Sequence, residues 1–171
     1  MSKTELVVFG PFDIPYGAGN GSSKRIDKSH AQEFVEYLKR ESLATKHGCY
    51  IFALKAGKGF SPWYVGMTSR GFGKECMETY QRDLYNGLLY AGRKGRPVMY
   101  FVAAPDTKNK IPAAVCDELE EVLIQSAHAR NPGLLNSKRK KIADWSVHGV
   151  IRSGKGKVPA NAKSFRTMMG L

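Results

Sequence analysis

Two tyrosines are the first residues in this chain whose type and setting suit chemistry. Tyr50 and Tyr64 each lie in a short apolar, aromatic segment, and Ala56-Gly57-Lys58-Gly59 separates the two segments. Turn residues between two strand-forming segments predict a β-hairpin. With the antiparallel pairing centred on Gly57, Tyr50 lies directly opposite Tyr64, and cross-strand partners share one face of a sheet. Two phenols then stand side by side, either as a functional pair or as ordinary packing.

Glu120 is the acid that differs most from its neighbours in the predicted helix 112–130. The residues one turn away from it are Cys116, Leu123 and Ile124, so it lies at the border of the apolar stripe. A carboxylate in that position needs a partner, because burial of an unpaired charge is costly. It is either a boundary residue that reaches water or meets a lysine, or a hard oxygen ligand for Mg²⁺.

The net charge of +12 is concentrated near the end of the chain. Residues 137–171 hold nine Lys and Arg against one acid, a net charge of +8, whereas residues 1–136 contribute only +4. A polyanion such as DNA, contacted mainly through its phosphates, is the natural partner of such a segment. The alternative is a basic tail that only increases solubility. The residues that we expect to contact nucleic acid are Lys138, Arg139, Lys140, Lys141, Arg152, Lys155 and Lys157.

Composition and length predict an ordinary soluble protein. With 42% apolar and 25% charged residues, the chain of 171 residues is expected to form a single domain, 1–171. No apolar segment approaches the ~20 residues that cross a bilayer, so no membrane partner is expected. The cysteines are three in number and include no Cys-x-x-Cys motif. They are expected to be buried thiols in a reducing compartment, which predicts a cytoplasmic location.

Periodicity predicts the elements that must position these residues. Helix 29–43 begins with a capping box of Ser29 and Gln32, and residues 12–28 before it are expected to be a flexible connection. The segment 97–104 is nearly continuous in apolar residues and is therefore a central strand, buried on both faces. The remaining predicted elements are strand 6–10, strands 49–54 and 63–68, helix 72–90, strand 147–151 and helix 159–169.

Four sequence features occur in an order and spacing that resemble the GIY-YIG nuclease superfamily. They are Gly48-Cys49-Tyr50, Tyr64-Val65-Gly66, Glu120, and Asn136 after the turn at Pro132. The resemblance covers roughly residues 46–137, which leaves 138–171 as a basic C-terminal extension. It implies an α+β fold, with a small, mostly antiparallel three-stranded sheet flanked by helices. Strands 49–54, 63–68 and 97–104 would form that sheet, and the N-terminal strand and helix would be additions to it.

The resemblance also implies an activity, hydrolysis of phosphodiester bonds by an endonuclease that uses Mg²⁺ or Mn²⁺. Tyr50 would be the general base or would orient the water, and Tyr64 would help to hold the nucleophile and phosphate. Glu120 would bind the metal, and Asn136 would tie the site together. A phenol with a pKa of ~10 is a poor base at neutral pH, so Tyr50 would need a neighbouring cation to lower that pKa.

The chain departs from the family at the cation of the site. The family has an arginine about eight residues after the second motif, and this chain has Lys74 there. Lysine lacks the planar fork that matches a phosphate. Either Lys74 replaces the arginine, or Arg70 or Arg82 supplies the charge, or activity is reduced or lost. The second hypothesis is therefore a protein that keeps the fold and binds nucleic acid or a partner without cleavage. A basic domain with a structural role is the third.

Overall fold

The structure is a computed structural model that describes residues 5–19, 21, 23–105, 111–141, 146–151 and 156–170. The chain forms two compact units, Met1–Lys140 and Lys141–Leu171. The boundary between them lies three residues after Lys138, where the basic extension was predicted to begin.

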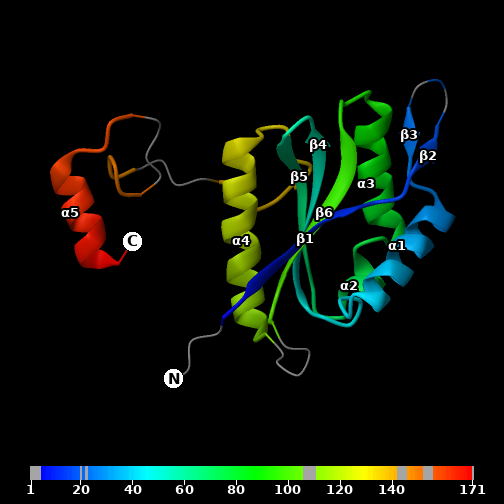
Figure 1. The fold of residues 1–171 in the computed structure, drawn as a ribbon, viewed down its shortest axis with the longest axis horizontal. Coiled ribbons are helices and arrows are strands. Elements are labelled where there is room, and N and C mark those ends of the chain that lie inside the picture. Colours follow the sequence, from blue (N-terminus) through cyan, green and yellow to red (C-terminus); the bar gives the residue numbers. More distant parts are fainter. Residues whose placement is uncertain are drawn as a thin grey trace. The chain divides into compact units, whose positions relative to one another are not determined.

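A four-stranded antiparallel sheet with strand order β1-β6-β4-β5 is the centre of the first unit (Figure 1). Its strands are β1 (Val7–Asp13), β4 (Gly48–Ala56), β5 (Gly59–Thr68) and β6 (Arg96–Ala103). The predicted α+β class is confirmed, and the apolar strand β6 is central as expected. The expectation of three strands is wrong, because β1 pairs with β6 and extends the sheet by one edge strand.

The segment before the first helix contains paired strands that were not predicted. β1 continues through Pro11 to Asp13, with a shift of register between Phe9 and Phe12. Proline is tolerated here because β1 is an edge strand and needs no further donor on its outer side. The expected flexible connection instead contains a small antiparallel pair, β2 (Gly17–Ala18) and β3 (Lys24–Arg25).

The register of the β4–β5 hairpin differs from the predicted one. Gly57 and Lys58 form a two-residue turn between Ala56 and Gly59, and a bulge near Trp63 shifts the register once more. Tyr50 therefore pairs with Gly66, and Tyr64 pairs with Phe52. The two tyrosines still share a face of the sheet, because the offset between them is two residues.

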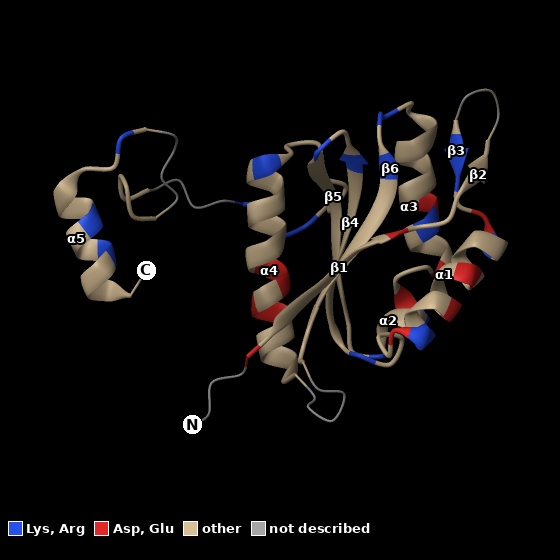
Figure 2. Ribbon diagram, viewed as in Figure 1, with Lys and Arg blue, Asp and Glu red and all other residues tan. Residues whose placement is uncertain are grey.

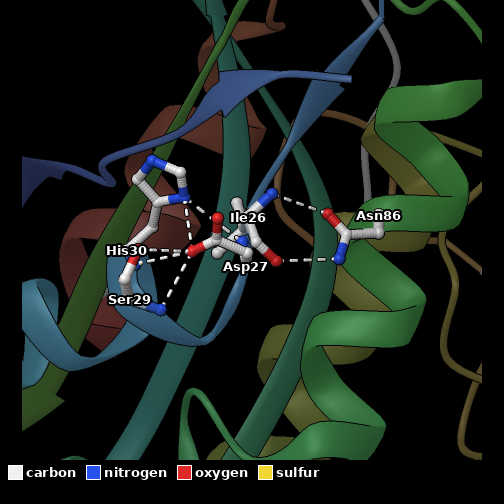
Figure 3. A network of polar contacts seen from close by, with 5 residues as sticks. All are labelled: Ile26, Asp27, Ser29, His30 and Asn86. Atoms are coloured by element: carbon white, nitrogen blue, oxygen red, sulfur yellow. Dashed lines mark hydrogen bonds and ion pairs between the residues drawn. The ribbon is translucent and has the colours of Figure 1, made fainter. Parts of the chain in front are cut away.

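Helix α1 (Lys28–Arg40) begins before the predicted capping residue. Its N-cap is Asp27, whose carboxylate accepts hydrogen bonds from the backbone N–H groups of Ser29 and His30. In return, the backbone N–H of Asp27 donates a hydrogen bond to His30 Nδ1 (Figure 3). The predicted box of Ser29 and Gln32 is therefore wrong. Asn86 fixes the residue before the cap, since its amide bonds both the N–H and the C=O of Ile26 at 2.8 and 2.9 Å.

The predicted helix 72–90 is two helices, α2 (Phe72–Glu75) and α3 (Thr79–Tyr90). The break falls at Cys76 and Met77, both of which are buried. The Cys76 carbonyl, which a continuous helix would use within its own ladder, accepts the hydroxyl of Tyr85 at 3.2 Å. A buried turn therefore stands where a continuous helix would have one further helical turn.

The helices cover both faces of the sheet (Figure 1). α1, α2 and α3 pack on one face over an aromatic core that includes Phe34, Phe52, Phe72 and Phe101. α4 (Ala113–Arg130) packs on the other face against β5. Cys49, Cys76 and Cys116 are all buried and free, as predicted.

The second unit contains α5 (Ala160–Met169), which confirms the predicted helix 159–169. Its charged residues are Lys163 and Arg166 (Figure 2). The predicted strand 147–151 is wrong, since these residues form a turn closed by one isolated bridge between Val147 and Ile151. Within the ranges that the structure describes, no helix combines the length and apolar character needed to cross a membrane.

Candidate active site

The motif glycines allow Tyr50 and Tyr64 to come together. The ring centroids of the two tyrosines lie 6.2 Å apart. A Cβ atom on Gly66 would overlap the Tyr50 ring, which lies directly over this residue of β5. Gly48 has a φ of +144°, and a Cβ there would overlap the Val102 carbonyl of β6. Both positions therefore require glycine. With glycine there, the phenol of Tyr50 in the first tripeptide can pack against Tyr64 in the second tripeptide.

Tyr50 is fully buried, which changes the role that it can play. Burial raises its pKa far above the ordinary value of 10, and its hydroxyl accepts a hydrogen bond from Gln81 Nε2 at 3.4 Å. The neighbouring Tyr64 and Glu75 raise its pKa further. The cation that would have to lower the pKa of Tyr50 for a role as general base is not among the groups that act on it, and the phenol lies inside the core.

Tyr64 is the more accessible phenol of the pair. Burial raises its pKa to about 12, and the negative charges of Glu120 and Glu75 contribute to the rise. A hydrogen bond with Tyr50 acts in the opposite direction and lowers the pKa of Tyr64. At neutral pH both phenols are protonated, and Tyr64 is the one that a solvent molecule can reach.

Glu120 lies at the border of the buried region, as the periodicity predicted. Its side chain is 17% exposed, and burial raises its pKa above 4.5. The partner that the sequence required is Arg139, whose Nη1 lies 3.1 Å from Glu120 Oε2 and lowers that pKa. A hydrogen bond from the backbone of Met67, in β5, lowers it as well. Arg139 also contacts Asp117 Oδ1 at 2.6 Å.

Asn136 binds the outer edge of β5. Its Oδ1 accepts the Val65 N–H at 2.9 Å, and its Nδ2 donates to the Val65 carbonyl at 2.7 Å. The backbone N–H of Leu135 donates to the Trp63 carbonyl at 2.8 Å, so the segment around Asn136 covers the strand edge. Asn136 thereby fixes the residue that follows Tyr64 in the chain.

The structure brings Tyr50, Tyr64, Glu120 and Asn136 together around β5. Sequence reasoning missed Glu75, the residue after Lys74, which lies close enough to raise the pKa of both Tyr64 and Glu120. No spacing signal in the sequence connected Glu75 with Tyr64 or Glu120. Arg139 was assigned to nucleic acid, although the need of Glu120 for a partner was the signal that could have found it.

The three candidate cations lie around one groove. Lys74 and Arg82 line it, and so does Glu78, which forms an ion pair with Arg70 at 3.1 Å. Arg70 Nη2 also lies 3.5 Å from Glu75, whose charge acts on Tyr64.

The predicted nucleic-acid contacts differ in their surroundings. Arg139 is held on α4, and Lys140 Nζ donates to the Leu134 carbonyl at 2.6 Å. Lys138, Lys141 and Lys157 are exposed. Arg152 and Lys155 lie outside the described residues.

The donor set around Glu120 fits a lightly coordinated magnesium ion. In the part of the chain that the structure describes, no three His, Cys, Asp or Glu side chains form a metal-binding group. Mg²⁺ commonly keeps several waters and binds through one or two carboxylates plus substrate phosphates. Glu120, with Glu75 close by, supplies a hard oxygen of that kind.

Comparisons with protein-family models, with curated proteins and with solved structures found no match to this chain.

Proposed function

We propose that this protein is a divalent-metal-dependent DNA endonuclease of the GIY-YIG type. One observation carries the proposal: Tyr64, Glu120 and Asn136 come from distant parts of the sequence and converge on β5. In this proposal β4, β5 and β6 correspond to the three strands of the family, and β1 and α1 are additions.

The roles of the residues follow from their settings. Hydrolysis requires that water attack the phosphorus while the bond to the 3′ oxygen breaks. With a pKa of about 12, Tyr64 remains protonated and orients the water or the phosphate by hydrogen bonding. Tyr50 is a positioning residue that holds Tyr64, and Asn136 fixes β5. Glu120 would hold Mg²⁺ or Mn²⁺, which when bound supplies positive charge at the phosphate oxygens.

The cation that faces the substrate is Arg70 in this proposal. It is more than half exposed and it contacts Glu75, one of the carboxylates that act on Tyr64. A guanidinium can also contact a phosphate through two parallel hydrogen bonds. Lys74, at the position of the family arginine, lines a groove that also includes Glu78, the ion-pair partner of Arg70.

The second candidate is a protein that binds nucleic acid without cutting it. Two observations favour it. None of Arg70, Lys74 and Arg82 is among the groups that shift the pKa of either tyrosine, and Arg139 already neutralises Glu120. Retention of Glu120 and of both phenols in one site favours the nuclease instead.

Nicking of supercoiled plasmid with added Mg²⁺ or Mn²⁺ tests the proposal. We expect wild-type protein to nick and Glu120→Gln to lose metal-dependent cleavage while it keeps its fold and its DNA affinity. The matched control is Glu121→Gln, because Glu121 is exposed and accepts a hydrogen bond from Gln125 Nε2 at 3.2 Å. Equal cleavage by both variants would exclude Glu120 as the ligand, and absence of nicking by wild type would favour the second candidate.

A further inference from the structure

A groove of about 460 Å³ lies between α1 and the segment that contains α2 and the start of α3. α1 and α2 lie side by side in Figure 1 and contact each other. The groove takes residues from the N-terminal addition as well as from the region of Lys74. Its size falls in the range of 300–1,000 Å³ that is common for ligand sites.

The acids of this groove are already neutralised by partners. Glu36 forms an ion pair with Lys39 at 2.6 Å, and Glu78 forms one with Arg70 at 3.1 Å. Three further cations, Lys28, Lys74 and Arg82, line the same groove, and none of them has an ion pair to a described acid. The groove therefore carries an uncompensated positive charge.

Arg82 has a hydrogen-bond donor that remains without a partner. Its Nη2 contacts Thr79 Oγ1 at 3.2 Å, whereas its Nε is buried and makes no hydrogen bond. A buried donor without an acceptor costs free energy. The guanidinium fork matches the geometry of phosphate oxygens.

Lys28 is a further cation of the groove, on the side that α1 forms. It is the first residue of α1 and follows the N-cap Asp27, whose carboxylate already faces the N-terminus of the helix. Val35 and Met77 give the groove an apolar surface on which a sugar or base can pack.

We propose that this groove binds one nucleotide unit of a nucleic-acid strand, with its phosphate held by Arg82 and Lys74 and approached by Lys28. The inference rests on the proposed function, and it gives Lys74 and Arg82 a role in strand binding rather than in catalysis. α2 connects the two sites, because Lys74 lines the groove while the adjacent Glu75 acts on Tyr64.

Binding of a fluorescent single-stranded DNA oligonucleotide, measured by anisotropy in EDTA, tests the inference without any cleavage. We expect Arg82→Gln and Lys74→Ala each to weaken binding about tenfold, since a lost charge-assisted contact is worth about 1.4 kcal/mol or more. Lys58→Ala, an exposed lysine in the turn between β4 and β5 and outside the groove, is the control and should change binding by less than about twofold. Arg82→Lys, with the charge retained, should recover part of the loss, and circular dichroism verifies that each variant is folded.

Two results would overturn the inference. Binding by Arg82→Gln and Lys74→Ala that equals the Lys58→Ala control would mean that the groove does not hold the strand. Displacement of the oligonucleotide from wild type by a free deoxynucleoside monophosphate at comparable concentration would indicate a small-molecule site instead. Failure of the nuclease proposal gives a different pattern, namely groove-dependent binding in EDTA with no nicking when metal is added.

Discussion

Arg139 is the cation that offsets the cost of holding Glu120 away from water. Burial favours the protonated form of Glu120, while the guanidinium 3.1 Å away favours the carboxylate. The same guanidinium contacts Asp117, which keeps it in place on α4. A metal ligand must be deprotonated, so Arg139 extends the pH range in which Glu120 can bind a cation.

This arrangement predicts a pH shift on substitution of Arg139. Arg139→Gln removes the charge that lowers the pKa of Glu120, so that pKa rises further above 4.5. The carboxylate is then lost at a higher pH as the solution is acidified, and the acidic limit of Mn²⁺ binding moves to higher pH. Calorimetric titration with Mn²⁺ over a pH series, in the absence of DNA, measures the shift.

Lys138→Gln is the control for this shift, because it removes one positive charge from the residue next to Arg139. Lys138 is exposed and is not among the groups that act on Glu120. An identical acidic limit in Arg139→Gln and wild type would mean that Arg139 does not control the protonation of Glu120.

The two tyrosines are expected to differ in their importance for cleavage. Tyr64→Phe removes the reachable phenol and should lower the rate about 100-fold, the usual scale for one transition-state hydrogen bond. Tyr50→Phe leaves Tyr64 in place without its hydrogen-bond partner and should cost less. Initial nicking rates of the two variants decide the order. Tyr90→Phe, on the exposed end of α3, is the control, and a larger loss in Tyr50→Phe than in Tyr64→Phe would return the direct role to Tyr50.

At the scale of elements, the edge of β5 depends on one side chain. Asn136→Ala would leave both the N–H and the C=O of Val65 without partners in a buried setting. Each such group costs about 1–3 kcal/mol, so the free energy of unfolding should fall by roughly 2–4 kcal/mol. Urea denaturation measures the loss, and the displaced strand should also reduce cleavage.

Asn86→Ala is the matched control for that prediction. Asn86 bonds the N–H and C=O of Ile26 in the same bidentate way, but on α3 next to the cap of α1 (Figure 3). It should lower stability without a specific loss of cleavage per folded molecule. Equal stability of Asn136→Ala and wild type would mean that water or another group can replace the amide at the β5 edge.

The elements that sequence could predict are those fixed by local pattern. The apolar segment of β6 and the periodic α4 appear where expected, because burial on two faces or on one stripe leaves a direct trace in the sequence. The break after α2 was not predictable, since the Tyr85 hydroxyl bonds the Cys76 carbonyl from outside the turn. The hairpin register also depended on a bulge near Trp63 that no residue type signals.

The candidate site shows the same limit. Glu120 could be singled out by its place on a helix, and Tyr50 and Tyr64 by their place in a hairpin. The burial of Tyr50 could not be predicted, because α1 and α3, which lie outside the two tyrosine motifs in the sequence, cover that face. The groove that Lys74 and Arg82 line likewise arises from packing against α1.

At the scale of the whole molecule, the basic C-terminal segment spans the boundary between the two units. Residues 137–171 carry +8 of the net +12, whereas the second unit, Lys141–Leu171, carries +5, because Lys138, Arg139 and Lys140 belong to the first unit. Positive residues beside glycine can approach a phosphate backbone closely, and such contacts position a protein without reading sequence. The segment around Lys155 and Lys157 has this composition, although Lys155 lies outside the described residues.

Salt dependence of DNA binding therefore tests the role of the second unit. Each phosphate neutralised contributes about −0.9 to the slope of log affinity against log salt on duplex DNA. Replacement of Lys155 and Lys157 by Ala should weaken binding to all duplexes alike and make the slope shallower by roughly 1 to 2 units. The control is replacement of Lys58 and Lys94 by Ala, which removes the same charge from two exposed loops of the first unit. An unchanged slope in the Lys155 and Lys157 variant, or an equal change in the control, would show that the basic C-terminal segment does not contact the duplex, and the binding surface would then lie in the first unit.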